Sequence, residues 1–180
     1  MFQSKKYIAS RHGQSSPNRY EYLQQLAHEY TSTNDIEAKQ QVLANLANFA
    51  YDPGNYDWLW DINVVDLFLD ALDNDDILLQ EFGLGGLANI CLEPRHQYYI
   101  VSDPKYIKAI SRYICSRPNN ATNNTILNAL TTLLLLLNSQ TQEVILTEEL
   151  KQGLIQLRTD VKYTTISRMA GLFLHDYYQE

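Results

Sequence analysis

The sequence predicts an all-α fold, a right-handed α-solenoid of about three to four helical repeats. Apolar residues step by three and four along much of the chain, which lines one face of an α-helix, as at Leu43, Leu46 and Ala50. This pattern recurs with a central leucine at intervals of 41, 43 and 42 residues, at Leu46, Leu87, Leu130 and Leu172. A helical period in the low forties is typical of armadillo and HEAT arrays. We therefore expect stacked helical units with the four leucines along one hydrophobic seam.

The first elements are expected to be two helices. Asn18 can cap a helix over about 19–30, since a side-chain oxygen at this position accepts a hydrogen bond from a backbone amide in the first turn. Asn34 or Asp35 can begin a long helix in the same way. Pro53 stops that helix, because proline lacks the amide hydrogen that a continuing helix needs.

Three further units, each with a short, a medium and a long helix, are expected after Pro53. The acidic run 73–76 ends one helix, and Pro104 stands at the first position of another, where proline is tolerated. The expected helices cover about 56–61, 64–72 and 77–92, then 96–101, 104–116 and 123–137, and finally 142–145, 148–157 and 161–178.

The chain is expected to form one domain with a short extension. Residues 1–17 are polar and show no periodicity, which predicts a flexible N-terminal arm ahead of a single repeat domain over 18–180. The chain has no run of eighteen apolar residues, and its start lacks the apolar core of a secretory signal. We therefore expect an intracellular protein without membrane contact, in which Cys91 and Cys115 stay reduced.

Composition limits the possible partners and cofactors. A net charge of −7 and a pI near 5.0 argue against binding nucleic acid through bulk positive charge. The four histidines are scattered, and none has a cysteine or acidic partner at a spacing that fixes a catalytic geometry. Cys91, His96 and Cys115 offer at most three ligands in no recognised zinc spacing. We expect no enzyme activity, no metal and no cofactor.

Three glycines, Gly83, Gly85 and Gly86, fall inside a predicted helix, where each costs about 1 kcal/mol relative to alanine. Close helix packing is the favoured explanation. A phosphate-binding loop is disfavoured because no strand precedes the glycines.

One long block of the sequence resembles a known family. The segments 42–53, 55–56 and 67–70, including the run Ala47-Asn48-Phe49-Ala50-Tyr51-Asp52-Pro53, are similar nearly residue for residue to the armadillo repeat-containing protein seven family. The likeness extends less tightly over about 18–178, and the third and fourth units and the N-terminal arm depart from the family pattern.

The resemblance implies a function. It implies a non-enzymatic armadillo scaffold of the minor spliceosome, located in the nucleus, that supports splicing of minor-class introns. It implies as partners a protein with an RNA-recognition domain and other spliceosomal proteins, with indirect or local contact to small nuclear RNA. The alternative is a general armadillo adaptor that binds basic extended peptides outside the spliceosome.

Armadillo proteins of the peptide-binding kind suggest where a partner binds. They hydrogen-bond an extended ligand through asparagines near the end of the third helix, and Asn48 and Asn89 stand there in this chain. The third and fourth copies have Thr132 and Leu174. Tryptophans usually stand one turn earlier, and Ala44, Gly85 and Asn128 replace them. Alternatively, the two asparagines only bridge adjacent repeats. Candidates on the same helical stripes are Gln41, Asp52, Phe82, Glu93 and Asn128.

Charge suggests two more candidate surfaces. No lysine or arginine occurs from Gln40 through Pro94, and the acidic residues Asp66, Asp70 and Asp73 share one helix face. We expect this acidic face to attract a basic protein partner. Lys105, Lys108 and Arg112 form a basic stripe on a later helix, which is a candidate contact for RNA phosphates. The alternative for both stripes is an ordinary solvated surface.

Overall fold

The computed structural model describes residues 18–116, 118, 121–138, 140–160 and 164–179. These residues form helices and connecting turns, with no strand among them. The prediction of an all-α, armadillo-type solenoid is therefore confirmed. The predicted arm over 1–17 lies outside the described residues, so the division into arm and domain stays a prediction.

The observed helices follow the expected order of short, medium and long elements. The first two are α2 (Arg19–Ser32) and α3 (Ile36–Phe49), followed by a 3₁₀ turn, η1 (Pro53–Asn55). The three units are α4 (Tyr56–Asp61), α5 (Val64–Leu72) and α6 (Ile77–Ile90); α7 (Pro94–Val101), α8 (Pro104–Cys115) and α9 (Asn123–Leu136); and α10 (Gln142–Ile145), α11 (Glu148–Thr159) and α12 (Thr164–Tyr178).

Polar side chains fix where the long helices begin. Asp35 accepts from the Glu37 amide at 2.9 Å, and Asp76 accepts from the Leu79 amide at 2.9 Å. The hydroxyl of Thr122 accepts from the Thr125 amide at 3.1 Å. Such caps satisfy amides that have no partner within the helix and contribute about 1 kcal/mol each. The starts of α3, α6 and α9 are therefore set by local sequence.

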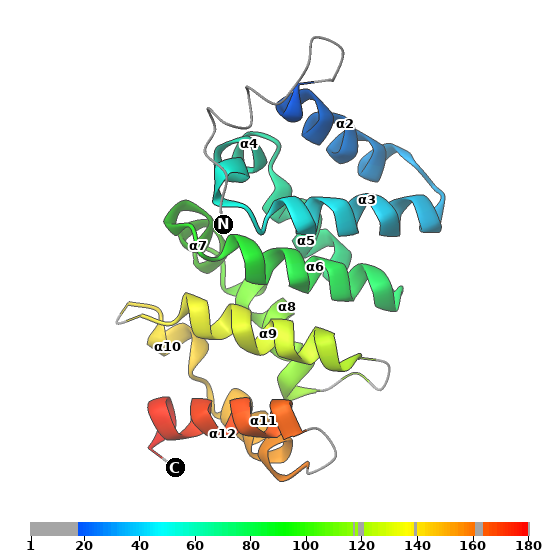
Figure 1. The fold of residues 1–180 in the computed structure, drawn as a ribbon. Coiled ribbons are helices and arrows are strands. Elements are labelled where there is room, and N and C mark those ends of the chain that lie inside the picture. Colours follow the sequence, from blue (N-terminus) through cyan, green and yellow to red (C-terminus); the bar gives the residue numbers. More distant parts are fainter. Residues whose placement is uncertain (1–17, 117, 119–120, 139, 161–163, 180) are drawn as a thin grey trace.

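The long helices are stacked in one layer. Figure 1 shows α3, α6, α9 and α12 one below another, with α5, α8 and α11 behind them and the short helices α4, α7 and α10 on one side. Leu46, Leu87 and Leu130 lie fully buried in this stack. Three of the four seam leucines are therefore placed as predicted.

The fourth seam residue was predicted wrongly. Leu172 is 63% exposed, whereas Phe173, 43 residues after Leu130, is buried. The buried stripe of α12 consists of Ile166, Ala170, Phe173 and Leu174. Neighbouring helical residues point about 100° apart, so a stripe through Phe173 turns Leu172 outward. Phe173 is thus the central residue of the last repeat, and His175, not Leu174, is the counterpart of Asn48.

The mid-helix glycines divide into two kinds. A Cβ on Gly83 would lie 2.7 Å from the Phe68 carbonyl oxygen, and one on Gly86 would lie 2.4 Å from the Phe68 ring. Close packing of α6 on α5 therefore explains these two. A Cβ on Gly85 would meet only the Asn128 side-chain nitrogen, at 3.3 Å. The packing explanation does not extend to Gly85.

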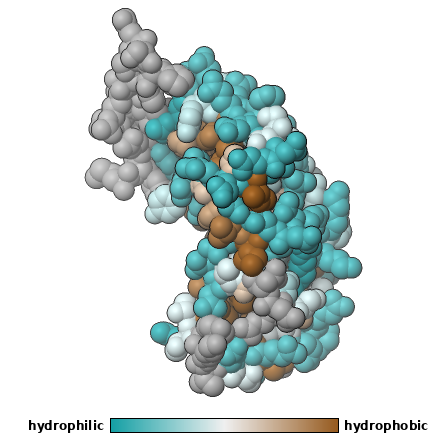
Figure 2. Space-filling view, turned by 90° about the vertical axis from the view of Figure 1, so that its right-hand side faces the viewer, coloured by the Kyte–Doolittle hydropathy of each residue, from teal (hydrophilic) through white to brown (hydrophobic). Residues whose placement is uncertain are grey.

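The surface includes apolar side chains at the start of two long helices. Ile36 begins α3, and Ile77 and Leu78 begin α6; all three are exposed. Figure 2 shows the side of the molecule where these helices begin, and a band of hydrophobic residues runs down it between hydrophilic ones. Across the described residues, no helix combines the length and the apolar character that crossing a membrane requires.

Candidate protein-binding site

A groove runs across the three adjacent long helices α3, α6 and α9. It has a volume of about 370 Å³, which lies within the range of protein ligand sites. We call it the amide groove, because four asparagines line it. Its lining residues are Ala44, Ala47, Asn48, Glu81, Phe82, Gly85, Asn89, Asn124, Leu127 and Asn128.

The asparagines of the amide groove differ in what they already bind. Asn89 donates from Nδ2 to the carbonyl oxygen of Ala47 at 2.9 Å, so this amide bridges two repeats. Its Oδ1 accepts no hydrogen bond from the described residues. Asn48 is exposed, and the side chains of Asn48 and Asn128 are likewise without partners among those residues. The groove therefore offers both donors and acceptors to a ligand main chain.

The described lining of the groove carries little charge. Its single ionisable residue is Glu81, whose carboxylate accepts from the Thr122 hydroxyl at 2.5 Å and from Asn124 Nδ2 at 2.8 Å. These bonds hold α6 against α9. Since its described lining includes no lysine or arginine, the surface favours main-chain hydrogen bonding over charge pairing.

Three residues that line the groove lack a bulky ring. Ala44, Gly85 and Asn128, which replace the tryptophans of peptide-binding armadillo proteins, meet here as their spacing predicts. Gly85 is not required by packing, and its lack of a side chain leaves the backbone of α6 open at the groove. Direct approach of a ligand chain to a helix backbone needs such a residue.

Four candidate residues of the predicted stripes do not line the amide groove. Thr132 is fully buried, and its hydroxyl donates to the Asn128 carbonyl oxygen at 2.8 Å, because a hydroxyl in a helix can satisfy itself four residues back. Asp52 accepts from the Gly54 amide and Glu93 accepts from the His96 amide, so both cap the following helices. Gln41 is exposed but does not line the groove.

Four lining residues were missed: Ala47, Glu81, Asn124 and Leu127. A spacing signal was available for two of them. Glu81 lies four residues before Gly85, and Asn124 lies four residues before Asn128. Residues four apart share a helix face, so the stripe could have been extended one turn toward each helix start.

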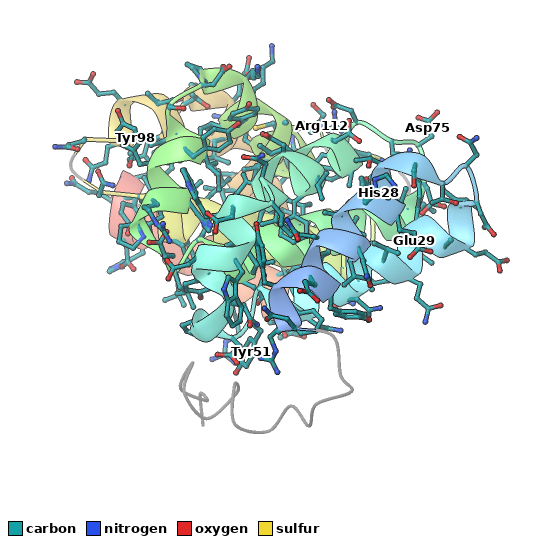
Figure 3. The ribbon with its side chains drawn as sticks, turned by 90° about the horizontal axis from the view of Figure 1, so that it is seen from above. His28, Glu29, Tyr51, Asp75, Tyr98 and Arg112 are labelled. Carbon is teal, nitrogen blue, oxygen red and sulfur yellow. The ribbon has the colours of Figure 1, made fainter. Side chains whose placement is uncertain are left out.

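A second groove lies between α5 and α8, and we call it the charged groove. The acidic residues Asp66, Asp70 and Asp73 line it together with the basic residues Lys105, Lys108 and Arg112. The two stripes predicted as separate surfaces therefore face one another. Seen from above in Figure 3, Arg112 lies on the opposite side of the molecule from Tyr51, which follows α3.

A buried histidine lies where α4 meets α7. His96 is fully buried and packs against the rings of Tyr56 and Trp60, and neither of its ring nitrogens forms a hydrogen bond with a described residue. Burial lowers the pKa of His96 to about 4, although Glu93 lies 3.7 Å away. The imidazole is therefore neutral at pH 7.

The cysteines have the character of core residues. Cys91 is a buried free thiol, and Cys115 is a half-buried one. Burial raises the pKa of the Cys91 thiol to about 12, so it carries almost no reactive thiolate at neutral pH. Within the described part of the chain, no three metal-ligating side chains gather into a group that could hold an ion.

Comparison with known proteins agrees with the repeat architecture. No family model matches the chain. Over 70 residues the chain is 54% identical to mouse (Mus musculus) armadillo repeat-containing protein 7. The resemblance to this family is confirmed. The match covers 39% of this chain and 35% of armadillo repeat-containing protein 7, so the chain spans about a third of the length of that relative. The shared repeats and the solenoid support a repeat scaffold that binds other proteins.

Proposed function

We propose that this protein is a non-enzymatic scaffold of the minor spliceosome, located in the nucleus. In this proposal it binds a protein with an RNA-recognition domain, and with it other spliceosomal proteins, and supports splicing of minor-class introns. The resemblance to armadillo repeat-containing protein 7 supports the assignment of a repeat scaffold. The splicing role follows from what that family resemblance implies.

The amide groove is the proposed docking surface, and its unpartnered amides are the observation that carries the proposal. Asn48 and Asn128 lie on the first and third of its three helices, and their side-chain amides form no hydrogen bond with another described residue. Asn89, between them, keeps its oxygen available. Amides in a row can hold an extended segment through its main chain, whatever its side chains are.

The second candidate function is a general adaptor for basic extended peptides. It is favoured by one observation, the position of Glu81 beside Phe82 in the amide groove, where a lysine or arginine could meet a carboxylate and a ring face. Glu81 already accepts two hydrogen bonds, which weakens this attraction. We therefore place it second.

Co-purification tests the proposal. The double variant Asn48→Ala/Asn128→Ala is expressed as a tagged full chain in cells, and the RNA-recognition subunit of the minor spliceosome is quantified in the eluate. We expect at least a fivefold loss of the recovered subunit, while the matched variant Asn123→Ala, which changes an exposed asparagine outside the groove, retains the partner.

Unchanged recovery with the double variant would remove the amide groove from the proposal. Absence of the subunit from the wild-type eluate would overturn the proposed function itself, and enrichment of unrelated basic peptides instead would favour the adaptor.

A further inference from the structure

The charged groove brings opposite charges together along two helices of successive repeats. Asp66, Asp70 and Asp73 stand four and three residues apart on α5, so they share one face of that helix. Lys105, Lys108 and Arg112 stand three and four residues apart on α8 and share the facing side. The groove between them has a volume of about 500 Å³, larger than the amide groove.

At both ends of the charged groove, residues of one repeat contact residues of the next. At one end Arg112 Nη1 lies 3.2 Å from Asp73 Oδ1, and Arg112 Nη2 donates to the carbonyl oxygen of Leu72. At the other end the Tyr99 hydroxyl donates to Asp66 Oδ1 at 2.6 Å. These contacts join one repeat to the next and leave the middle of the groove open.

The middle of the groove carries one unpaired charge on each side. Asp70 and Lys108 are exposed, and the side chain of neither forms a hydrogen bond or ion pair with another described residue. Lys105 differs, because its ammonium lies 2.9 Å from Asp103 Oδ2. Each charge has an apolar neighbour in the chain that also lines the groove, Leu69 beside Asp70 and Ala109 beside Lys108.

This arrangement disfavours a nucleic-acid ligand. A phosphate placed against Lys108 would also face the carboxylates of α5 across the same groove, and like charges at that range repel. A purely basic segment would be repelled by the positive charge of Lys108. A segment with both signs of charge satisfies both sides.

We infer that the charged groove binds a short segment of a partner protein that carries a basic, an apolar and an acidic side chain. The basic side chain pairs with Asp70, the acidic one with Lys108, and the apolar one covers Leu69 and Ala109. This surface is separate from the amide groove, so the inference does not depend on which partner occupies that groove.

Three synthetic peptides of twelve residues test the inference. They share the same apolar residues and differ at their charged positions, which hold alternating Lys and Glu, Lys alone or Glu alone. Binding to the full chain is measured by fluorescence anisotropy, with a single-stranded RNA oligonucleotide as a fourth probe. We expect the mixed peptide to bind about fivefold to tenfold more tightly than the other three probes.

Charge reversals then test whether Asp70 and Lys108 determine which peptide binds most tightly. Asp70→Lys should shift the preference to the Glu peptide, Lys108→Glu should shift it to the Lys peptide, and the double reversal should restore the mixed peptide. Both positions are exposed, and unfolding temperatures check that each variant is folded. Equal binding of all peptides, or a preference that the reversals do not change, would overturn the inference. Tightest binding of the RNA, lost in Lys108→Glu and strengthened in Asp70→Lys, would overturn it in favour of a phosphate site.

Discussion

Asn89 donates its side-chain amide to the carbonyl oxygen of Ala47, at a distance of 2.9 Å across two successive repeats. Asn89 is also held within its own unit, because Tyr56 on α4 donates from its hydroxyl to the Asn89 carbonyl oxygen at 3.1 Å. Asn48, the counterpart of Asn89 in the preceding repeat, has no such partner among the described residues. Two asparagines that are equivalent in sequence therefore have different roles, one mainly structural and one available to a ligand.

This difference predicts unequal effects on stability. Asn89→Ala removes a partly buried hydrogen bond and should lower the free energy of unfolding by about 1 kcal/mol. Asn48→Ala removes an exposed side chain that has no partner among the described residues, and it should change the free energy of unfolding by less than about 0.5 kcal/mol. Urea unfolding of both variants measures the contrast, and equal losses would show that Asn48 also joins the repeats.

For the two kinds of mid-helix glycine, substitution with alanine should change the stability of the protein in opposite directions. Gly86→Ala places a Cβ 2.4 Å from the buried ring of Phe68 and should destabilise the protein by about 1–3 kcal/mol through overpacking. Gly85→Ala meets only the end of a flexible side chain and should stabilise α6 by about 0.5–1 kcal/mol. Destabilisation by Gly85→Ala, measured in the same urea titration, would mean that packing also requires this glycine.

The helices were largely predictable from the sequence because local signals set their limits. Asp35, Asp76 and Asp103 cap helices that begin at the next residue, and Pro53 ends the first long helix region as expected. The position of Leu172 was not predictable in this way. Whether Leu172 or Phe173 is the buried central residue depends on the orientation of α12 about its own axis. Packing against neighbouring helices sets that orientation, and the local sequence does not.

The sites were less predictable than the helices for a related reason. Helical spacing identified Asn48 and Asn128 as groove residues, because both lie on the inner stripe. The same spacing could not show that Asn89 uses its donor within the fold, since the acceptor is a main-chain oxygen in another repeat. Nor could it show that the stripes on α5 and α8 face one another.

The register of the last repeat predicts which apolar residue of α12 is structural. Phe173→Ala removes a buried ring and should cost about 3–5 kcal/mol of unfolding free energy. Leu172→Ser changes a side chain that is 63% exposed and should have an effect within about 0.5 kcal/mol. Thermal or urea unfolding distinguishes the two variants. A large loss of stability from Leu172→Ser would show that Leu172 belongs to the hydrophobic seam after all.

His96 predicts an acid-dependent loss of stability. Its folded-state pKa of about 4 lies below the value near 6.5 expected in the unfolded chain, so the unfolded chain binds the proton first as the pH falls. The contribution of the neutral imidazole is complete above about pH 6.5 and decreases toward pH 4. By pH 5 the unfolding free energy should have fallen by about 2 kcal/mol from this group.

The control for that prediction is His96→Leu, which fills the same buried site without a titrating group. Carboxylates, including Glu93, titrate in both proteins, so the quantity compared is the change in unfolding free energy between pH 7.5 and pH 5. We expect the change to be about 2 kcal/mol smaller in the variant. The same pH dependence in both proteins would show that His96 does not set it.

The missing side chain of Gly85 in the amide groove predicts a variant that folds but no longer binds. Gly85→Trp places an indole over the backbone of α6, between Phe82 and Leu127, where the proposed ligand chain runs. Because tryptophan has a better helix propensity than glycine, the fold should tolerate it, while recovery of the RNA-recognition subunit should fall at least fivefold. Ile77→Trp is the matched control, since it adds an indole to the same helix at an exposed position outside the groove. If Gly85→Trp retains the partner as fully as Ile77→Trp does, the ligand chain does not cross α6 at Gly85.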